Sequence, residues 1–345
     1  MKEFKIMLIW SLLAIFIVSL GFLFLDQFVF KNSSDFNIKE VSTNNESKDY
    51  DTKLPDNAEN IQCSYNGQYI SYDVDSKFYI YDASANKSKE YITTDSEKAI
   101  LNYKWLPDRN MIVMAEKKKN DNGKSVISLV NFNAKTGDEK SIIDLTSYSS
   151  GLEVDDIATT TLAGVSYVSI SSKDSDYATL YRIDINNEMK KVKTAVKSIG
   201  QMQVCPQKDN LIYCDSSKKI YYSYTNAKNN KIKLSGNGGY DLLDIDNNSN
   251  VYLGIISGDK VSKIIYGQSD KATSTWTSVK LDKEVAPSDI HINSNNEIMV
   301  NDSDEKKVND LTTKKSYSYS GELIQITDYV IFSKNGNKVS VKKMA

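Results

Sequence analysis

Short apolar or alternating segments, separated by polar turns, occupy the chain from Ile61 onward. No segment of this region places apolar residues at i, i+3, i+4 and i+7 over three helical turns, so the pattern does not predict amphipathic helices. Runs such as Tyr69–Val74, Val126–Phe132 and Val251–Ile256 have instead the length and the β-branched and aromatic content of strands. The pattern therefore predicts an all-β region built from hairpins.

A strand–turn–strand unit recurs along this region, and its turn is the most recognisable part. In each copy, a turn rich in Asn, Asp, Gly or Pro leads into an apolar strand. The copies are Ser64–Tyr72, Leu106–Met114, Thr161–Ile170, Cys205–Tyr213, Asp244–Leu253, Asn293–Val300 and Thr327–Val341. They begin roughly 35–55 residues apart, which brackets the ~40–50 residues of a β-propeller blade.

The best-preserved units contain four strands each, which is the content of one propeller blade. A single blade cannot bury both of its faces, so blades must stack around an axis. Seven turns predict seven blades, with six as the alternative because two copies depart from the pattern. The last segment, Leu323–Lys343, holds about three strands. Its missing outer strand is expected to come from the residues before the first blade, either Phe36–Val41 or Ala58–Ile61.

Two of the turn-and-strand stretches carry a family resemblance. The segments SYNGQYISYDVDSKFYIYD, from Ser64, and LPDRNMIVMAE, from Leu106, resemble the repeats of TolB-like propellers. They are also similar to the propeller that precedes the hydrolase domain of dipeptidyl peptidase IV-type enzymes. The resemblance covers most of residues 61–345 and implies a propeller fold. Because the chain ends where such a hydrolase domain would begin, no peptidase activity is expected from it.

An uninterrupted apolar run, Ile6–Leu25, precedes the β-rich region. The run contains no charged residue, and as a helix it spans roughly 30 Å, the thickness of the hydrocarbon core of a bilayer. Lys2 and Lys5 precede it, so the positive-inside rule places the N-terminus in the cytoplasm. A cleaved signal peptide has a shorter apolar region and a small-residue cleavage site, which residues 27–30 do not offer. The run is therefore predicted to be an uncleaved transmembrane signal anchor rather than a signal peptide or a buried helix.

These predictions divide the chain into four parts. Residues 1–5 form a cytoplasmic tail, residues 6–25 the transmembrane anchor, residues 26–60 a flexible extracytoplasmic linker and residues 61–345 the propeller. The linker is rich in Asn, Ser, Asp and Lys and lacks sustained periodicity, as a tether does. The propeller is therefore expected at the cell membrane, on its extracytoplasmic side.

Charge and composition argue against several classes of function. The net charge is −2 and the pI about 5.7, so the chain has no overall basic charge with which to bind nucleic acid. Arg109 and Arg182 are the only arginines, which argues against bidentate clamps for phosphate or carboxylate groups. The excess of Lys, Asn, Ile and Tyr indicates an AT-rich bacterial genome.

The sequence offers no recognisable catalytic set. His291 is the only histidine, so no Ser–His–Asp or Cys–His arrangement is available without it, and on a predicted strand it is interpreted as structural. No nucleophile elbow, HExxH helix or P-loop is present. One histidine and three cysteines also argue against zinc. Cys205 and Cys214 flank one turn and could form a hairpin disulfide; with Cys63 the cysteine count is odd, and buried free thiols are the favoured alternative.

One turn spaces oxygen-bearing side chains as calcium loops do. Asp244, Asp246, Asn248 and Asn250 stand at alternate positions. However, the sixth position of this loop is Ser249 and not the glycine of an EF-hand, and the twelfth is not a glutamate. An Asx-rich β-turn is the favoured interpretation and calcium the alternative. No other cofactor is indicated.

The leading hypothesis for function is a binding, scaffold or sensor module at the bacterial cell envelope, with a protein or an envelope polymer as its partner. Trp105, Asp108 and Arg109 lie beside one of the repeated turns and are the candidate ligand-binding residues. Catalysis is not expected, since no catalytic set is recognisable. Two alternatives remain: an envelope glycan-active hydrolase that uses two carboxylates on the propeller axis, and an accessory subunit of an envelope export or assembly complex.

Overall fold

The computed structural model describes residues 48–91, 98–236 and 238–344, together with Trp10, Leu13, Val18 and Ser19 near the N-terminus. The chain divides into two units, Met1–Glu46 and Ser47–Ala345, and the propeller is the second. The predicted tail (1–5), most of the anchor (6–25) and the linker up to residue 47 lie outside the described residues. Within the described residues, no helix is long and apolar enough to cross a membrane.

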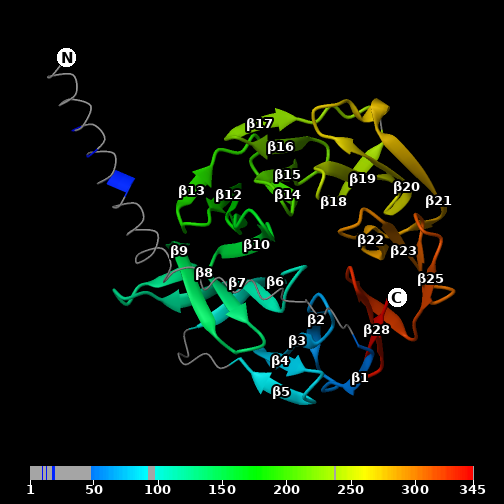
Figure 1. Cartoon of the computed structure of the whole chain (residues 1–345), viewed down its shortest axis with the longest axis horizontal. Coiled ribbons are helices and arrows are strands. Elements are labelled where there is room, and N and C mark those ends of the chain that lie inside the picture. The colour runs from blue at the N-terminus through cyan, green and yellow to red at the C-terminus, as the bar shows by residue number, and fades with distance from the viewer. Residues whose placement is uncertain are drawn as a thin grey trace. The chain divides into compact units, whose positions relative to one another are not determined.

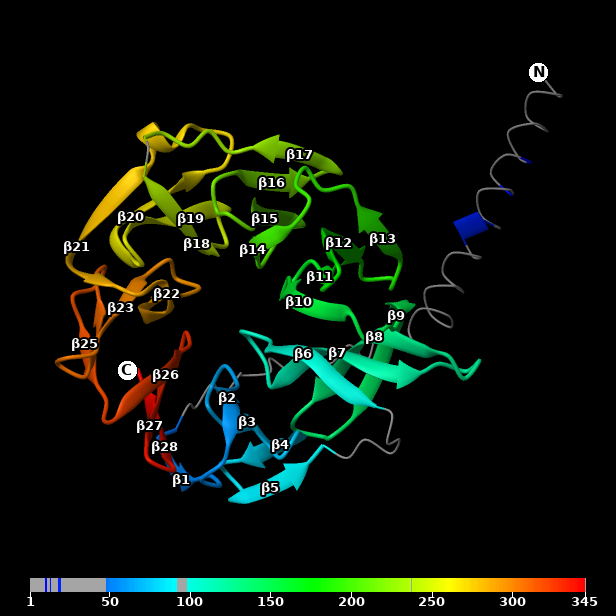
Figure 2. The same ribbon diagram turned by 180° about the vertical axis from the view of Figure 1, so that it is seen from behind.

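Seven antiparallel four-stranded sheets form the second unit, so the prediction of a seven-bladed propeller is confirmed and the six-bladed alternative is wrong. Figure 1 shows the blades around a central axis, with the first strand of each blade nearest the axis, and Figure 2 shows the ring from behind. Two short 3-10 helices, Thr273–Thr275 and Pro287–Asp289, flank the last strand of blade 5.

The blades follow one another along the chain. Blade 1 contains β2 (Glu59–Cys63), β3 (Tyr69–Val74), β4 (Lys77–Asp82) and β5 (Lys87–Glu90); blade 2 contains β6 (Ala99–Trp105), β7 (Met111–Lys119), β8 (Ser125–Asn133) and β9 (Glu139–Ser147). Blade 3 contains β10 (Leu152–Thr159), β11 (Ser166–Ser172), β12 (Ser175–Ile183) and β13 (Met189–Val192); blade 4 contains β14 (Ile199–Val204), β15 (Asn210–Asp215), β16 (Tyr221–Thr225) and β17 (Lys228–Lys231).

The remaining three blades complete the ring. Blade 5 contains β18 (Gly239–Ile245), β19 (Asn250–Ser257), β20 (Lys260–Gln268) and β21 (Thr277–Val285); blade 6 contains β22 (Ile290–Ile292), β23 (Ile298–Asp302), β24 (Lys307–Asp310) and β25 (Ser316–Ser318). Blade 7 contains β26 (Glu322–Ile326), β27 (Val330–Asn335) and β28 (Lys338–Lys343) from the C-terminus, and β1 (Tyr50–Lys53) from the N-terminal side.

The ring closes as the sequence predicts, but with a different strand. β1 pairs antiparallel with β28, from Tyr50 opposite Val341 to Lys53 opposite Lys338. Of the candidate Ala58–Ile61, residues 59–61 instead belong to β2, the inner strand of blade 1, and Phe36–Val41 lies outside the described residues. The propeller therefore begins at residue 50, and the predicted boundary at residue 61 is wrong. An outer strand is held mainly by backbone hydrogen bonds, and β1 exposes every second residue, so its four residues carry almost no apolar pattern.

The repeated turns connect the first and second strands of each blade, and we call them the inner turns. In the blade 5 turn, the Asp246 carboxylate accepts hydrogen bonds from the backbone N–H groups of Asn248 and Asn250, both at 2.8 Å. Such Asx contacts favour Asp and Asn at turn starts. In blade 1, Gly67 has a φ of 72°, and a Cβ there would lie 2.2 Å from Val341 Cγ1. Only glycine fits this turn, because it packs against blade 7.

Apolar side chains fill the seams between neighbouring blades, and amide side chains join several inner strands. Asn102 donates to the carbonyl of Val154 at 2.9 Å, which links blades 2 and 3. Gln325 accepts from the N–H of Cys63 at 2.9 Å, which links blades 7 and 1. The three cysteines are buried free thiols, so the disulfide between Cys205 and Cys214 is not formed. The chain contains 22 tyrosines, and many of their rings are buried inside these seams.

Candidate functional site

The seven inner turns lie at one end of the propeller axis, around a cavity that we call the axial pocket. It has a volume of about 470 Å³ and is lined by the ends of the inner strands and by the inner turns of blades 2 to 7. Its polar lining residues include Lys104, Asp108, Thr159, Thr161, Gln203, Gln207, Asp244, Asp246, Asn247, His291, Asn293, Ser294 and Asp328. The repeat therefore brings residues distant in sequence to one place.

Three polar residues occupy equivalent positions in three blades. Lys104, Asp244 and His291 each stand two residues before the residue whose N–H closes an inner turn. Side chains alternate along a strand, so the same offset from the turn gives the same direction toward the axis. All three residues line the axial pocket. Lys104 forms no ion pair within the described residues, although its charge acts on both Asp156 and Asp244.

Asp244 is a carboxylic acid with a perturbed affinity for its proton. Burial raises its pKa to about 6, against the smaller opposing effects of the Ile245 N–H group and the charges of His291 and Lys104. The Ile245 N–H donates to Asp244 Oδ1 at 2.7 Å. The negative charge of Asp328 adds to the increase in pKa. Asp244 therefore changes protonation in the range where many enzymes and sensors operate.

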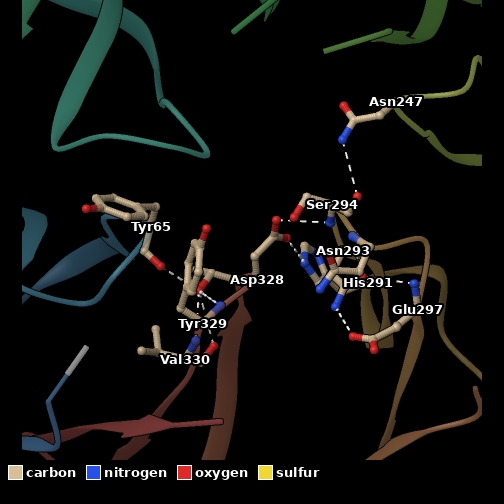
Figure 3. A network of polar contacts seen from close by, with 11 residues as sticks. Tyr65, Asn247, His291, Asn293, Ser294, Glu297, Asp328, Tyr329 and Val330 are labelled. Atoms are coloured by element: carbon tan, nitrogen blue, oxygen red, sulfur yellow. Dashed lines mark hydrogen bonds and ion pairs between the residues drawn. The ribbon is translucent and has the colours of Figure 1, made fainter. Parts of the chain in front are cut away.

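Asp328 behaves in the opposite way, although it lines the same pocket (Figure 3). His291 Nε2 lies 3.0 Å from Asp328 Oδ1, and the N–H of Ser294 donates to Asp328 Oδ2 at 3.0 Å. Burial alone would raise the pKa of Asp328, but the hydrogen bonds and the charge of His291 hold it below its usual value. Asp328 is therefore an ionised carboxylate at neutral pH.

Hydrogen bonds between neighbouring inner turns connect the rim of the pocket on one side (Figure 3). Asn247 of blade 5 donates to the carbonyl of Ser294 in blade 6 at 3.2 Å. Ser294 binds Asp328 of blade 7, and Thr327 donates to the carbonyl of Tyr65 in blade 1 at 2.8 Å. These contacts hold the polar groups of four blades in fixed positions, which favours binding with little loss of conformational entropy.

The predicted ligand-binding residues take two different places. Asp108 lines the pocket and forms an ion pair with Arg109 at 2.6 Å. Arg109 also donates to the carbonyl of Thr161 at 3.3 Å, so this pair joins the rim of blade 2 to blade 3. Trp105 also contributes to the lining of the pocket, but it is only 7% exposed, and its indole N–H donates to Ser71 Oγ at 2.9 Å. The Trp105 ring is thus directed into the seam between blades 1 and 2.

The four residues of the possible calcium loop also separate. Asp244 and Asp246 both line the axial pocket, but Asp246 Oδ2 accepts hydrogen bonds from Asn250 Nδ2 at 2.9 Å and from the Tyr252 hydroxyl at 3.2 Å. The Asp246 carboxylate is therefore engaged inside its own blade, and Asn248 lies in the turn that it closes. Among the described residues, no group of three or more His, Cys, Asp or Glu is placed to hold a metal ion. Calcium stays a prediction.

The sequence pattern did not indicate Lys104, His291 or Asp328 as site residues. Each of the three belongs to a different blade. The interpretation of His291 as structural accounts for its contact with Asp328, but not for its place in the pocket lining. An alignment of the seven inner turns would have shown that Lys104 and His291 occupy the position of Asp244. Asp328 has no such signal, because it lies within its turn and not two residues before it.

Comparison with known proteins supports the fold and no more. No protein-family model matches the chain, and no curated protein sequence matches it. The propeller is similar to an oligogalacturonate lyase from Vibrio parahaemolyticus, with a TM-score of 0.54, 11% identity and coverage of 84% of this chain and 93% of that one. A chain of the mitotic checkpoint complex gives a TM-score of 0.52 at 9% identity, over 85% and 90% of the two chains.

Dipeptidyl peptidase 4 from Porphyromonas gingivalis also matches, with a TM-score of 0.46 and 11% identity over 75% of this chain and 44% of that one. The propeller fold that the resemblance of the repeats implies is confirmed by the likeness to the lyase, and as a likeness of fold alone. At such low identity, a shared propeller says nothing about ligand or reaction.

Proposed function

We propose that this protein is a binding module of the bacterial cell envelope whose recognition site is the axial pocket. The observation that carries this proposal is the convergence of Lys104, Asp244 and His291 from three blades on one pocket. A volume of about 470 Å³ falls within the ~300–1,000 Å³ of small-molecule sites. In this proposal, residues 6–25 tether the propeller to the extracytoplasmic face of the cell membrane.

The pocket favours a small polar ligand, or the end of an envelope polymer, that carries both hydrogen-bond donors and an acidic group. Asp328 supplies a fixed negative charge, and Lys104 a cation without an ion-pair partner in the described part of the chain. Asp244 donates or accepts a hydrogen bond according to its protonation. Such a mixed set of groups selects among ligands, because a ligand that leaves one of these groups without a hydrogen-bond partner binds more weakly by the cost of desolvating that group.

Calorimetry with muropeptides tests this proposal. Soluble muropeptides released from purified peptidoglycan are titrated into the full-length protein in a mild detergent. Binding is expected, with the dissociation constant raised at least about tenfold by Asp244→Asn or Lys104→Met. Lys280→Met and Asp282→Asn, on the exposed strand β21, are matched controls and should bind as the original protein does. Equal binding by pocket and control variants would refute the axial site.

A fusion experiment tests the membrane topology separately. Alkaline phosphatase, which is active only outside the cytoplasm, is joined after residue 345 of the full chain. Activity in whole cells, with the fusion in the membrane fraction, is the expected result. A fluorescent protein that matures in the cytoplasm should stay dark at the same position. The opposite pattern would place the propeller inside the cell and rule out an envelope role.

The pocket also supports a second candidate function, an envelope glycan-active hydrolase. The specific observation is that burial raises the pKa of Asp244 to about 6, whereas hydrogen bonding lowers that of Asp328. Two carboxyl groups with opposite shifts are the pattern of a general acid and its ionised partner. A hydrolase of this kind should cleave purified peptidoglycan at a rate that changes with pH near 6, as Asp244 changes its protonation. The substitution Asp244→Asn should lower that rate by at least about a hundredfold. Absence of turnover would leave the binding function alone.

A further inference from the structure

A second cavity lies between blades 1 and 2, away from the axis, and we call it the lateral groove. Its volume is about 520 Å³, and both blades contribute to its lining. We propose that the lateral groove docks an extended, acidic and apolar segment of a partner protein. This inference does not depend on a ligand in the axial pocket.

The floor of the lateral groove is aromatic and apolar. Tyr69 and Ile80 of blade 1 and Phe132 of blade 2 are each buried and line the groove. Tyr91 lies beside them, with its ring edge-on to Phe132 at a centroid distance of 5.2 Å. When apolar side chains of a partner cover such a floor, the complex is stabilised by about 25 cal/mol per Å² of apolar surface removed from water.

Small residues keep the groove open. Ala85 lies in the turn after β4, and Ala134 and Gly137 lie in the turn between β8 and β9. Gly137 has a φ of 78°, and a Cβ built there would lie 3.1 Å from Lys89 Nζ. The Lys89 ammonium therefore extends across to the opposite turn, and a larger residue at position 137 would displace it.

The acidic residues of the groove are already engaged. Asp82 accepts hydrogen bonds from the N–H groups of its own turn, including that of Ser84 at 2.9 Å. Glu90 forms an ion pair with Lys77 at 3.2 Å. Glu139 pairs with Lys98 at 2.7 Å. Because each of the three carboxylates has a hydrogen-bond or ion-pair partner, its repulsion of an acidic ligand is reduced.

The lysines of the groove are in the opposite situation. Lys87, Lys89 and Lys135 are exposed, line the groove and form no ion pair in the part of the chain that the structure describes. Three unpaired cations above an apolar floor match a segment in which acidic and apolar residues alternate. Charge complementarity of this kind raises association rates and discriminates against basic partners.

The strand beside the groove explains the expected conformation of the ligand. β5 is the outer strand of blade 1 and pairs only with β4 among the described strands. Its second edge therefore presents backbone N–H and C=O groups along Lys87–Glu90. An extended segment can pair with such an edge while its alternate side chains enter the neighbouring groove.

Fluorescence anisotropy with designed peptides tests the proposal. The probe is a fluorescein-labelled ten-residue peptide of alternating glutamate and leucine, titrated with the full-length protein in mild detergent at low salt. Binding is expected to weaken at least about tenfold in the triple variant Lys87→Glu, Lys89→Glu, Lys135→Glu, and also in Ala134→Trp, which fills the groove without changing charge. An alternating lysine–leucine peptide should not bind.

A matched triple variant controls for overall charge. Lys190, Lys228 and Lys231 lie on the outer strands β13 and β17, and their reversal to Glu should leave binding of the acidic peptide almost unchanged. Equal loss in both triple variants, or no effect of Ala134→Trp, would overturn the proposal. Self-association of the full chain, or binding to anionic phospholipid vesicles, that is abolished by the groove variants would also overturn it, because the occupant would then be a second copy or a membrane.

Discussion

Blade 2 packs against its two neighbours in different ways. Its face toward blade 3 is apolar: Ile127 and Leu129 are fully buried in a cluster with Ile157 and Val168 of blade 3. Its face toward blade 1 also has an apolar cluster, but there Glu116 is fully buried and pairs with Lys98 at 3.0 Å. One strand, β7, supplies both faces through the alternation of its side chains.

The two seams therefore differ in what holds them. In the seam between blades 2 and 3, stability comes from buried apolar area and close packing. In the seam between blades 1 and 2, part of it comes from a network in which Lys98 contacts Glu116 and Glu139, and Tyr91 donates to Glu139. Buried charges cost desolvation, so this network adds specificity more readily than stability. The lateral groove opens beside it.

The largest expected effect comes from truncating the apolar seam. Ile127→Ala should reduce the free energy of unfolding by about 4 kcal/mol, because the rigid surroundings leave a cavity. Ile80→Ala, in the floor of the lateral groove, is the matched control and should cost only about 2 kcal/mol, since the groove already admits water. Urea unfolding of the full-length protein measures both. Equal losses would show that the two seams are packed alike.

The next effect tests the charged network. Lys98→Met leaves the buried Glu116 carboxylate without its ion-pair partner and should cost about 3 kcal/mol at pH 7. The loss should shrink at acidic pH, because protonated Glu116 needs no counter-charge. Lys173→Met, which removes an exposed pair with Glu153, should cost less than about 1 kcal/mol. If Lys98→Met lowers the free energy of unfolding at pH 7 by no more than this control does, water reaches Glu116.

A hydrogen bond in the same seam gives a smaller effect. Trp105→Phe removes the indole N–H that donates to Ser71 and should cost about 1 kcal/mol beyond the loss of ring area. The double variant with Ser71→Ala isolates this bond, because the two single losses should then not add. Strict additivity would indicate that the bond contributes nothing.

The blades could be predicted from the sequence because their turns are local. A residue such as Asp246 closes its turn through contacts two and four residues away, and a short window of sequence shows that chemistry. β1 could not be predicted, because what selects Tyr50–Lys53 is the free edge of β28, almost 300 residues away along the chain. The closing strand is defined by its partner and not by its own pattern.

The site was less predictable for the same physical reason. Asp108 and Arg109 lie in the inner turn of blade 2, between β6 and β7, so their place near the axis follows from the repeat. The opposite pKa shifts of Asp244 and Asp328 depend on burial and on His291, which belongs to another blade. Likewise, Lys98 and Glu139 are brought together by the register of β9, which no local window reveals.

The pH dependence of stability gives the finest comparison, because two carboxylates of one network should contribute with opposite sign. Burial raises the pKa of Glu116, so the folded state holds this proton more tightly than the unfolded state. The contribution of Glu116 to stability therefore falls as the pH rises from the usual pKa of 4.5 toward the raised pKa, and Glu116→Gln should remove that fall.

Glu139 should contribute with the opposite sign. Burial opposes its ionisation too, but hydrogen bonds from Lys98 and Tyr91 lower its pKa. Its contribution to stability therefore appears as the pH rises, and Glu139→Gln should remove that gain. Urea unfolding between about pH 3 and pH 7 measures both contributions, because the gain from Glu139 appears mainly below its usual pKa of 4.5. Slopes of the same sign for the two variants, relative to the original protein, would contradict the network.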